Sequence, residues 1–276
     1  MELLFPPEEI RALIGTTDLA AFDNPSGDAV IPDVERRTYG DILDFGCGCG
    51  RLARQFVQQI PQPRSYLGLD LHAGMASWCA DNLAPFAAQF RFEHHDVFSP
   101  GFNPEADNKH AALPVQDQSR DLVIAHSVFT HITEDSAIFY LEECARVLRD
   151  DGYLVSTWFL FDKRQFPMMQ PFQNALYINT IDPTNAVIFD GGWLKEACQL
   201  AGLRLVSFAK PELRGYHWVL RFARTEHPSS FTLPDDDAPI GSLPPPILTV
   251  PLHTIGVSQT PTPSQQEAPI RWWRRS

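Results

Sequence analysis

Three alternating glycines after a short apolar run constrain this chain more than any other feature. The segment "DILDFGCGCGRLARQF", residues 41–56, breaks from apolar alternation into Gly46, Gly48 and Gly50 and resumes at Arg51 with helical spacing of apolar residues. A strand that enters such a turn and continues as a helix presents bare backbone and helix amides to a nucleotide-like ligand. Glycine runs also form purely structural turns, so the run alone leaves both interpretations open.

Short apolar runs alternate with amphipathic segments from residue 41 onward, which predicts a parallel sheet covered by helices. Strands are expected in "DILDFG", "SYLGLD", "FRFEHHD", "DLVIAHSVF" and "YLVSTWFLF". Helices are expected in "RLARQFVQQI", "AGMASWCADNLA", "EDSAIFYLEECARVLR" and "GGWLKEACQLAG". Near the end, "LRLVSFAK" and "YHWVLRFAR" predict two strands joined by a short turn.

Composition divides the chain into three parts. Residues 1–39 hold a short helix in "PPEEIRALIG" followed by a loop, and residues 40–225 form the α/β domain. Within that domain, residues 160–190 lack a sustained period and are interpreted as an acceptor-side insertion outside the core. Residues 226–276 are rich in Pro, Ser, Thr and Asp, which predicts a mostly disordered tail. Its end, "RWWRRS", fits a solvated terminus, with a docking peptide or membrane-surface anchor as the alternative.

Charge and cysteine content exclude several function classes. The formal net charge of −12 repels a phosphate backbone, so no nucleic-acid partner is expected and a small-molecule acceptor fits better. The five scattered cysteines predict no disulfide framework and a cytoplasmic location, and Cys47 and Cys49 lack the partners of a zinc site. No signal peptide is recognised and no apolar stretch reaches about 18 residues, so no integral membrane association is expected. The oligomeric state is not predicted.

Three aspartates lie at the ends of successive predicted strands. Asp44, Asp70 and Asp96 are 26 residues apart, which places them along one rim of the sheet. Asp70 is suited to accept hydrogen bonds from both ribose hydroxyls of a nucleotide, with the N-cap of the following helix as its alternative role. Asp96 is suited to accept the amine of an adenine, with an ordinary turn aspartate as its alternative.

These residues resemble the class I S-adenosylmethionine-dependent methyltransferases. The likeness covers about residues 40–223 and lies in five motifs in the family's order: "LDFGCGCGR", "LGLD", "HHDVF", "DLVIAHSVFTHI" and "EECARVLRDDGYLVST". It implies an α/β fold with a Rossmann-like, doubly wound, seven-stranded sheet and a terminal antiparallel strand. It also implies S-adenosyl-L-methionine as cofactor and S-adenosyl-L-homocysteine as product.

The resemblance further implies which residues hold the cofactor. The first motif contacts the methionine part, the second-strand acid contacts the ribose, and the third-motif acid contacts adenine. The expected cofactor-binding set is Asp44, Gly46, Cys47, Gly48, Gly50, Arg51, Asp70, Leu71, Asp96, Val97 and His126. No metal ligand is expected.

Two other functions fit part of this pattern. A nicotinamide-dependent oxidoreductase would need glycine in place of Arg51, and its glycine turn does not usually follow an acid such as Asp44, so this class is disfavoured. A catalytically inactive module that binds S-adenosylmethionine is the other alternative. The intact acids argue against it.

Methyl transfer to a hydroxyl needs alignment and a general base. His126 and His131, at and just after the end of the fourth strand, are the predicted catalytic residues. His126 has packing beside the cofactor as its alternative role, and His131 has capping of the next helix with Thr133. Asp162 and His217 are the least favoured candidates for this base. His94 and His95 are expected to be structural.

Aromatic and N-terminal residues supply the remaining predictions. Side chains before and within the insertion are expected partly to wall an apolar acceptor pocket and partly to fill the core: Trp158, Phe159, Phe161, Phe166, Met168, Met169, Phe172 and Tyr177. The segment around Phe5, Ile10 and Phe22 is expected to cover the cofactor. O-methylation of a sugar-containing or aromatic natural product is preferred, with N-, C- or peptide methylation as alternatives.

Overall fold

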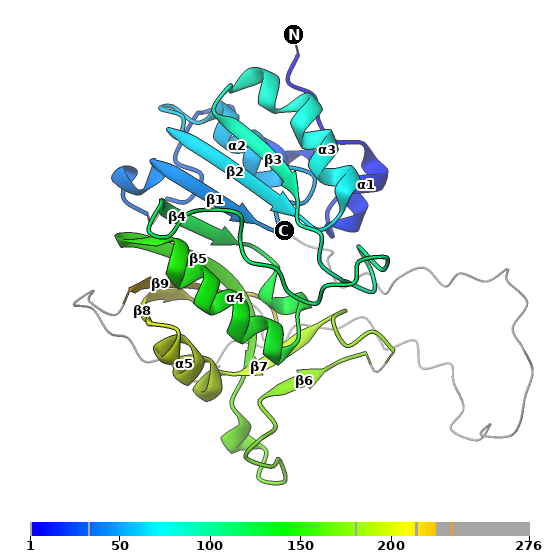
Figure 1. Ribbon diagram of the computed structural model, residues 1–276, viewed down its shortest axis with the longest axis vertical. Coiled ribbons are helices and arrows are strands. Elements are labelled where there is room, and N and C mark those ends of the chain that lie inside the picture. Colours follow the sequence, from blue (N-terminus) through cyan, green and yellow to red (C-terminus); the bar gives the residue numbers. More distant parts are fainter. Residues whose placement is uncertain (1, 33, 180, 213–214, 225–232, 234–276) are drawn as a thin grey trace, which may run out of the picture.

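One mixed sheet with helices on both faces forms the body of the protein (Figure 1). The computed structural model describes residues 2–32, 34–179, 181–212, 215–224 and 233. The strands are β1 (Asp41–Phe45), β2 (Ser65–Asp70), β3 (Phe90–His94), β4 (Arg120–Ala125), β5 (Leu148–Phe161), β6 (Ala175–Tyr177), β7 (Val187–Asp190), β8 (Leu203–Ala209) and β9 (Trp218–Arg224).

The strand order confirms the predicted fold class. Strands β3, β2, β1, β4 and β5 lie side by side in that order and are parallel, and β9 runs antiparallel between β5 and β8. Order reverses between β1 and β4, so the crevice at the carboxyl ends of these two strands is where a doubly wound sheet binds its ligand.

Helices cover the two faces because successive strand residues point to opposite sides. Ile42 packs in a cluster with α2 (Arg51–Gln58) and α3 (Ala73–Asn82). Its neighbour Leu43 packs in the cluster of α4 (Glu134–Val147) and α5 (Gly191–Leu200). Both side chains are fully buried, which stabilises the fold by about 1.5–3 kcal/mol each. Strands buried on both faces explain the continuous apolar runs of the sequence.

The interpretation of residues 160–190 as lying outside the core was wrong in part. Strand β5 is longer than its neighbours, and its last residues, Phe159–Phe161, pair in parallel with β7, which pairs in turn with β6. Val187 and Phe189 of β7 are 0% exposed. A strand of four residues is too short for its alternation to stand out in the sequence. Among the described residues the sheet therefore has nine strands, where seven were expected, with the β6–β7 pair toward the lower end of Figure 1.

Short helical elements complete the described chain. The predicted N-terminal helix is α1 (Glu8–Leu13), which follows Pro7 and ends before Gly15 in the left-handed region. The 3-10 turns are η1 (Leu19–Phe22), η2 (Arg36–Tyr39), η3 (Ala84–Phe86), η4 (Phe129–His131) and η5 (Lys163–Gln165).

Within the described ranges, the structure contains no helix with the length and apolarity needed to cross a membrane. Apart from Leu233, the predicted tail 226–276 lies outside the described residues.

Candidate functional site

The glycine turn between β1 and α2 needs glycine for internal reasons. Gly46, Gly48 and Gly50 have φ angles of +81°, +55° and +83°, which other residues adopt only under strain. A Cβ on Gly46 would lie 2.3 Å from Cγ2 of Val128, and one on Gly48 would lie 2.9 Å from Cγ2 of Ile14. The protein's own side chains therefore pack against these glycines, so the glycines alone do not identify a ligand.

Backbone amides tie this turn to the end of β2. The N–H groups of Gly46 and Cys47 both donate to the carbonyl oxygen of Leu69, at 2.8 and 2.9 Å. The N–H of Gly48 donates to Oδ2 of Asp70 at 2.7 Å, and the N–H of His72 donates to Oδ1 at 2.8 Å. Two backbone donors fix the orientation of the Asp70 carboxylate beside the turn.

Asp70 is not the N-cap of the following helix, which was its alternative role. The N-cap of α3 is His72, whose Nδ1 accepts a hydrogen bond from the N–H of Met75 at 3.2 Å. An oxygen atom that accepts one N–H retains a second lone pair. The Asp70 carboxylate can therefore accept further hydrogen bonds from hydroxyl groups on its outer side.

Asp44 has a buried carboxyl oxygen without a hydrogen-bond partner in the described part of the chain. Its side chain is 1% exposed; Tyr66 donates its hydroxyl to Oδ2, and Oδ1 accepts no bond. Burial raises the pKa of Asp44 to about 7, although the Tyr66 hydrogen bond and the charge of Arg51 act in the opposite direction. Buried polar atoms without a partner are rare in folded proteins, and this one is suited to a cationic donor.

Positive potential lies next to this carboxyl group. Helix α2 begins after Gly50, which supplies no side-chain cap, and its first turn holds no acidic residue. Burial lowers the pKa of Arg51, while the charges of Asp44 and Cys49 raise it. The helix N-terminus and the guanidinium favour an anionic group beside Asp44. The carboxyl group of Asp44 and the guanidinium of Arg51 together match the ammonium and the carboxylate of a free amino acid.

The third predicted acid occupies the next strand end. Asp96 follows β3, is exposed, and accepts a hydrogen bond on Oδ1 from Nδ2 of Asn103 at 3.0 Å. Val97 is buried beside it. His94 pairs with Asp70 in the parallel ladder, and its Nε2 lies 3.0 Å from the carbonyl oxygen of Leu71. The predicted adenine and ribose residues thus stand on adjacent strand ends.

The two predicted catalytic histidines have different surroundings. His126 follows β4 directly, and burial lowers its pKa well below the ordinary value. His131 lies in η4, and its Nδ1 is 3.1 Å from the carbonyl oxygen of Thr184 in the insertion. Burial also lowers the pKa of His131, which therefore stays neutral at pH 7. Its ring contacts the insertion and does not cap α4, whose N-cap is Thr133.

His217 lies beside His126, a placement that the sequence did not predict. Its ring centroid lies 5.9 Å from that of His126, and its Nε2 lies 3.4 Å from Oγ of Ser127. The pairing of β9 with β5 explains this placement. It sets Trp218 opposite Trp158 and so brings His217 to the same edge of the sheet. That pairing joins segments far apart in sequence.

Other predicted roles agree with their surroundings. Asp162 caps η5 and pairs with Arg164 at 2.8 Å. His95 is buried with Nε2 3.0 Å from the hydroxyl of Tyr140, which is a structural contact, as expected. Trp158 lies in the core and stacks on Phe129.

The aromatic residues of the insertion divide into two groups. Phe159 is buried at the histidine cluster, and Phe161 and Met169 are half-buried. Four others are exposed: Phe166, Met168, Phe172 and Tyr177.

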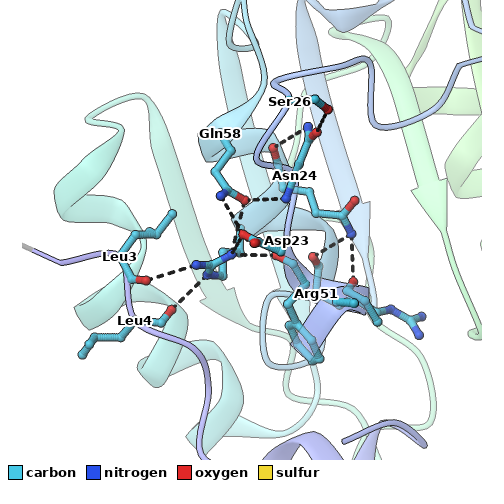
Figure 2. A network of polar contacts seen from close by, with 12 residues as sticks. Leu3, Leu4, Asp23, Asn24, Ser26, Arg51 and Gln58 are labelled. Atoms are coloured by element: carbon cyan, nitrogen blue, oxygen red, sulfur yellow. Dashed lines mark hydrogen bonds and ion pairs between the residues drawn. The ribbon is translucent and has the colours of Figure 1, made fainter. Parts of the chain in front are cut away.

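The N-terminal segment packs against the glycine turn and the start of α2. Phe22 is 0% exposed and forms a small core with Cys49 and Met75, against which Phe5, Ile10 and Ile14 pack. Figure 2 shows the carbonyls of Leu3 and Leu4 and the carboxylate of Asp23 converging on one guanidinium, which belongs to Arg54 of α2. Residues on both sides of α1 are therefore fixed to α2 by one side chain.

No group of three or more His, Cys, Asp or Glu side chains in the described ranges is arranged to hold a metal ion.

Residues 42–152 match a family model described as a methyltransferase domain. A malonyl-[acyl-carrier protein] O-methyltransferase of Hahella chejuensis is 28% identical over 154 residues, which is 55% of this chain and 49% of the relative. An uncharacterized methyltransferase of Emericella nidulans is 29% identical over 126 residues, 42% of this chain and 40% of the relative. The chain spans about half the length or less of these curated relatives.

Solved structures share the fold. A methyltransferase from Aquifex aeolicus superimposes with a TM-score of 0.50 at 14% identity, covering 80% of this chain and 98% of that one. An O-methyltransferase from neocarzinostatin biosynthesis, in complex with S-adenosylmethionine and 2-hydroxy-5-methyl naphthoic acid, gives a TM-score of 0.52 at 15% identity. That match covers 77% of this chain and 56% of the other.

Proposed function

We propose that this chain carries a class I S-adenosylmethionine-dependent methyltransferase domain and transfers a methyl group from S-adenosylmethionine to the oxygen of a small molecule. The observation that carries this proposal is the buried Oδ1 of Asp44, which has no partner among the described residues. The family model supports methyltransferase activity for residues 42–152, and we extend this activity to the whole chain.

The charges of the site fit the methionine end of the cofactor. Asp44 would accept a hydrogen bond from the ammonium, while Arg51 and the first amides of α2 would hold the carboxylate. Gly46, Cys47, Gly48 and Gly50 would border this part of the cofactor.

The strand ends fit its nucleoside. Asp70, oriented by two backbone donors, would accept the ribose hydroxyls, and Leu71 lies next to it. Asp96 and Val97 would border the adenine, and His126 would border the methionine sulfur.

When bound, S-adenosylmethionine supplies an electrophilic methyl group on a positively charged sulfur. The protein contributes alignment, which can account for much of the rate of such a transfer. His126 and His131 are neutral at pH 7 and so can accept a proton from an acceptor hydroxyl.

An oxygen acceptor is favoured by the histidines and by the aromatic insertion, which suits a flat, partly apolar molecule. The curated Hahella relative and the neocarzinostatin enzyme are both named O-methyltransferases, which supports the same acceptor atom. A sugar-containing or aromatic natural product is the preferred acceptor class.

Calorimetry tests the cofactor part of this proposal. Purified protein is titrated with S-adenosylmethionine, S-adenosylhomocysteine and NAD, and Asp44→Asn is titrated in parallel. We expect both sulfur nucleosides to bind the wild type, NAD not to bind, and the variant to lose most of its affinity. Binding of NAD alone would contradict the proposal.

Release of S-adenosylhomocysteine tests the acceptor. The panel contains phenols, sugars, amines and a malonyl thioester, each with S-adenosylmethionine present. Turnover of phenols or sugars supports O-methylation, whereas turnover of amines alone contradicts it. Binding without turnover of any member identifies the inactive-module alternative.

A further inference from the structure

The loop that follows β3 uses its own backbone donors next to Asp96. The N–H of Val97 donates to the carbonyl oxygen of His95 at 2.8 Å, and the N–H of Phe98 donates to that of Asn108 at 2.7 Å. The peptide bond between His95 and Asp96 is trans, so the N–H of Asp96 points away from the carbonyl group that Val97 contacts. The two N–H groups that follow Asp96 are therefore already paired within the protein.

Asn103 reaches Asp96 from the end of a closed turn. Its N–H donates to the carbonyl oxygen of Ser99 at 3.0 Å, and its carbonyl oxygen accepts from the N–H of Ser99 at 3.1 Å. Its Nδ2 donates to Oδ1 of Asp96 at 3.0 Å and to the carbonyl oxygen of Val97 at 3.1 Å. A side-chain amide carries two N–H donors, and these two bonds use both. Asn103 therefore ties the Asp96 carboxylate to the backbone beside it.

The second oxygen of this carboxylate faces no donor of the protein. Within the described ranges, Oδ2 of Asp96 accepts no hydrogen bond, and the residue is exposed. An ionised carboxylate accepts hydrogen bonds and donates none. With Oδ1 held by Asn103, Asp96 presents Oδ2 as an acceptor of defined orientation at the end of the strand.

The pairing of the strands brings this acceptor next to the ribose residue. Asp70 is the partner of His94 in the parallel pairing of β2 and β3, and Asp96 follows His94 by two residues. Neighbouring strands lie about 4.8 Å apart, so a purine attached to a ribose at one strand end extends to the next. A nucleoside whose ribose is held by Asp70 can therefore bring the edge of its base to Asp96.

We propose that Asp96, with Asn103 as its positioning residue, selects the base of the cofactor through its 6-amino group, and that the ring nitrogen N1 is not read; this rests on the proposed function. The amino group of adenine donates a hydrogen bond to Oδ2 of Asp96. N1 of adenine is an acceptor, and the N–H groups of Val97 and Phe98 that could reach it are engaged elsewhere. Asp96 and Asn103 thus determine specificity for the base without contacting the transferred methyl group.

Two analogues of S-adenosylhomocysteine separate the two parts of this proposal. S-inosylhomocysteine carries a carbonyl oxygen in place of the amino group, so it sets an acceptor against the Asp96 carboxylate. The 1-deaza analogue keeps the amino group and replaces N1 by C–H. By calorimetry, we expect wild type to bind S-adenosylhomocysteine about tenfold or more tighter than S-inosylhomocysteine, the loss expected for a hydrogen bond to a charged group. The 1-deaza analogue should bind within about threefold of S-adenosylhomocysteine, since no hydrogen bond to the protein is lost.

Asp96→Asn tests the selecting group without altering the turn. An amide can accept a hydrogen bond from the amino group of adenine or, with its two ends exchanged, donate one to the carbonyl oxygen of inosine. We expect this variant to bind the two ligands within about threefold of each other, because neither base then meets a repulsive contact. A preference that stays at the wild-type value in Asp96→Asn overturns the inference.

Asn103→Ala tests the positioning role. We expect the preference for adenine over inosine to fall at least about threefold, because Oδ1 of Asp96 loses the donor that orients the carboxylate. The matched control is Asn108→Ala, which removes an exposed side chain of the same kind from the same loop and keeps the carbonyl group that Phe98 contacts. Asn108→Ala should keep the wild-type preference, and thermal melts establish that each variant is folded.

The ratio of the two affinities separates positioning from a structural role. A loosened fold weakens the binding of all three ligands together and leaves their ratios unchanged. An unchanged ratio in Asn103→Ala therefore overturns the positioning role. Equal binding of the adenosine and inosine compounds by wild type, or a loss of more than about tenfold on replacing N1, overturns the inference as a whole. Failure of wild type to bind either S-adenosylmethionine or S-adenosylhomocysteine instead overturns the proposed function.

Discussion

The hydroxyl of Tyr66 donates a hydrogen bond to one oxygen of Asp44 and leaves the other oxygen of the same buried carboxyl without a partner in the described chain. Tyr66 pairs in the sheet with Ile42, two residues before Asp44, so the contact links β1 and β2 beneath the glycine turn. A fully buried acid with one unsatisfied oxygen costs stability, and a ligand that supplies the missing donor recovers it. The Asp44 carboxyl group should therefore raise the affinity for the cofactor and lower the stability of the protein without cofactor.

Asp44→Asn should stabilise the protein without cofactor at neutral and alkaline pH. The pKa of Asp44 is raised from 3.8 to about 7, so between these values the unfolded state loses the proton that the folded state keeps. Stability of the wild type then falls with rising pH across this window, by at most about 4 kcal/mol at about 1.4 kcal/mol per pKa unit. Asparagine does not titrate, so the variant escapes this loss.

Thermal and urea unfolding at pH 4, 6 and 8 measure this effect. The difference between variant and wild type should grow from pH 4 to pH 8. A constant difference would show that Asp44 titrates normally. Asp117→Asn is the control, since Asp117 is an exposed partner of Arg146.

Affinity for S-adenosylmethionine should rise with pH through the same range. The cofactor ammonium binds the ionised form of Asp44, and at pH 6 most of this carboxyl group carries a proton because burial raises its pKa to about 7. We expect Kd to fall about tenfold between pH 6 and pH 8. The Asp44→Asn protein should bind weakly and without this dependence. Calorimetry in buffers of different ionisation enthalpy would also detect the proton released on binding.

Asp70→Asn should weaken cofactor binding and also loosen the glycine turn. The carboxylate accepts hydrogen bonds from the N–H groups of Gly48 and His72, and an amide can accept only one of them. We expect a loss of about 1–3 kcal/mol in stability and about 10²-fold in affinity for S-adenosylhomocysteine. The control Asp96→Asn changes an exposed acid and should cost tenfold or less. Equal affinities for wild type and Asp70→Asn would contradict the ribose assignment.

Local sequence predicted the rim acids because each lies at or near the end of a short strand. Asp44 and Asp70 sit on neighbouring parallel strands whose register follows from apolar patterning alone. The alternative role of Asp70 as a helix cap was wrong because the cap lies two residues later, at His72.

Pairing between strands that are far apart in sequence places residues that the local sequence pattern does not predict. His217 reaches the site only because β9 returns antiparallel to β5, and no nearby residue signals that pairing. Strand β7 was missed for a similar reason. The residues of β5 that pair with it begin at Phe159, too far from β7 in the sequence for a local pattern to indicate the pairing. The left-handed backbone of Ser127 likewise depends on Thr157 of another strand.

Arg54→Met should release the N-terminal segment from α2. The Arg54 side chain is 5% exposed, pairs with Asp23 at 2.5 Å, and donates to the carbonyl oxygens of Leu3, Leu4 and Phe22. Methionine fills a similar volume but satisfies none of these acceptors. We expect a loss of about 3 kcal/mol in stability, in the range for a broken buried ion pair.

Trypsin cleavage after Arg11 reports on the same release, because Arg11 lies buried in α1 with its guanidinium bonded to the carbonyl oxygens of Pro6 and Thr17. Arg54→Met should be cleaved there faster than wild type, whereas Arg64→Met, which removes an exposed ion pair, should not. Ile14 packs against Gly48, so we expect a ligand bound at the glycine turn to contact this segment. S-adenosylhomocysteine should therefore slow the cleavage in wild type and have little effect in Arg54→Met. Equal protection in both proteins would show that the segment is held by contacts other than Arg54.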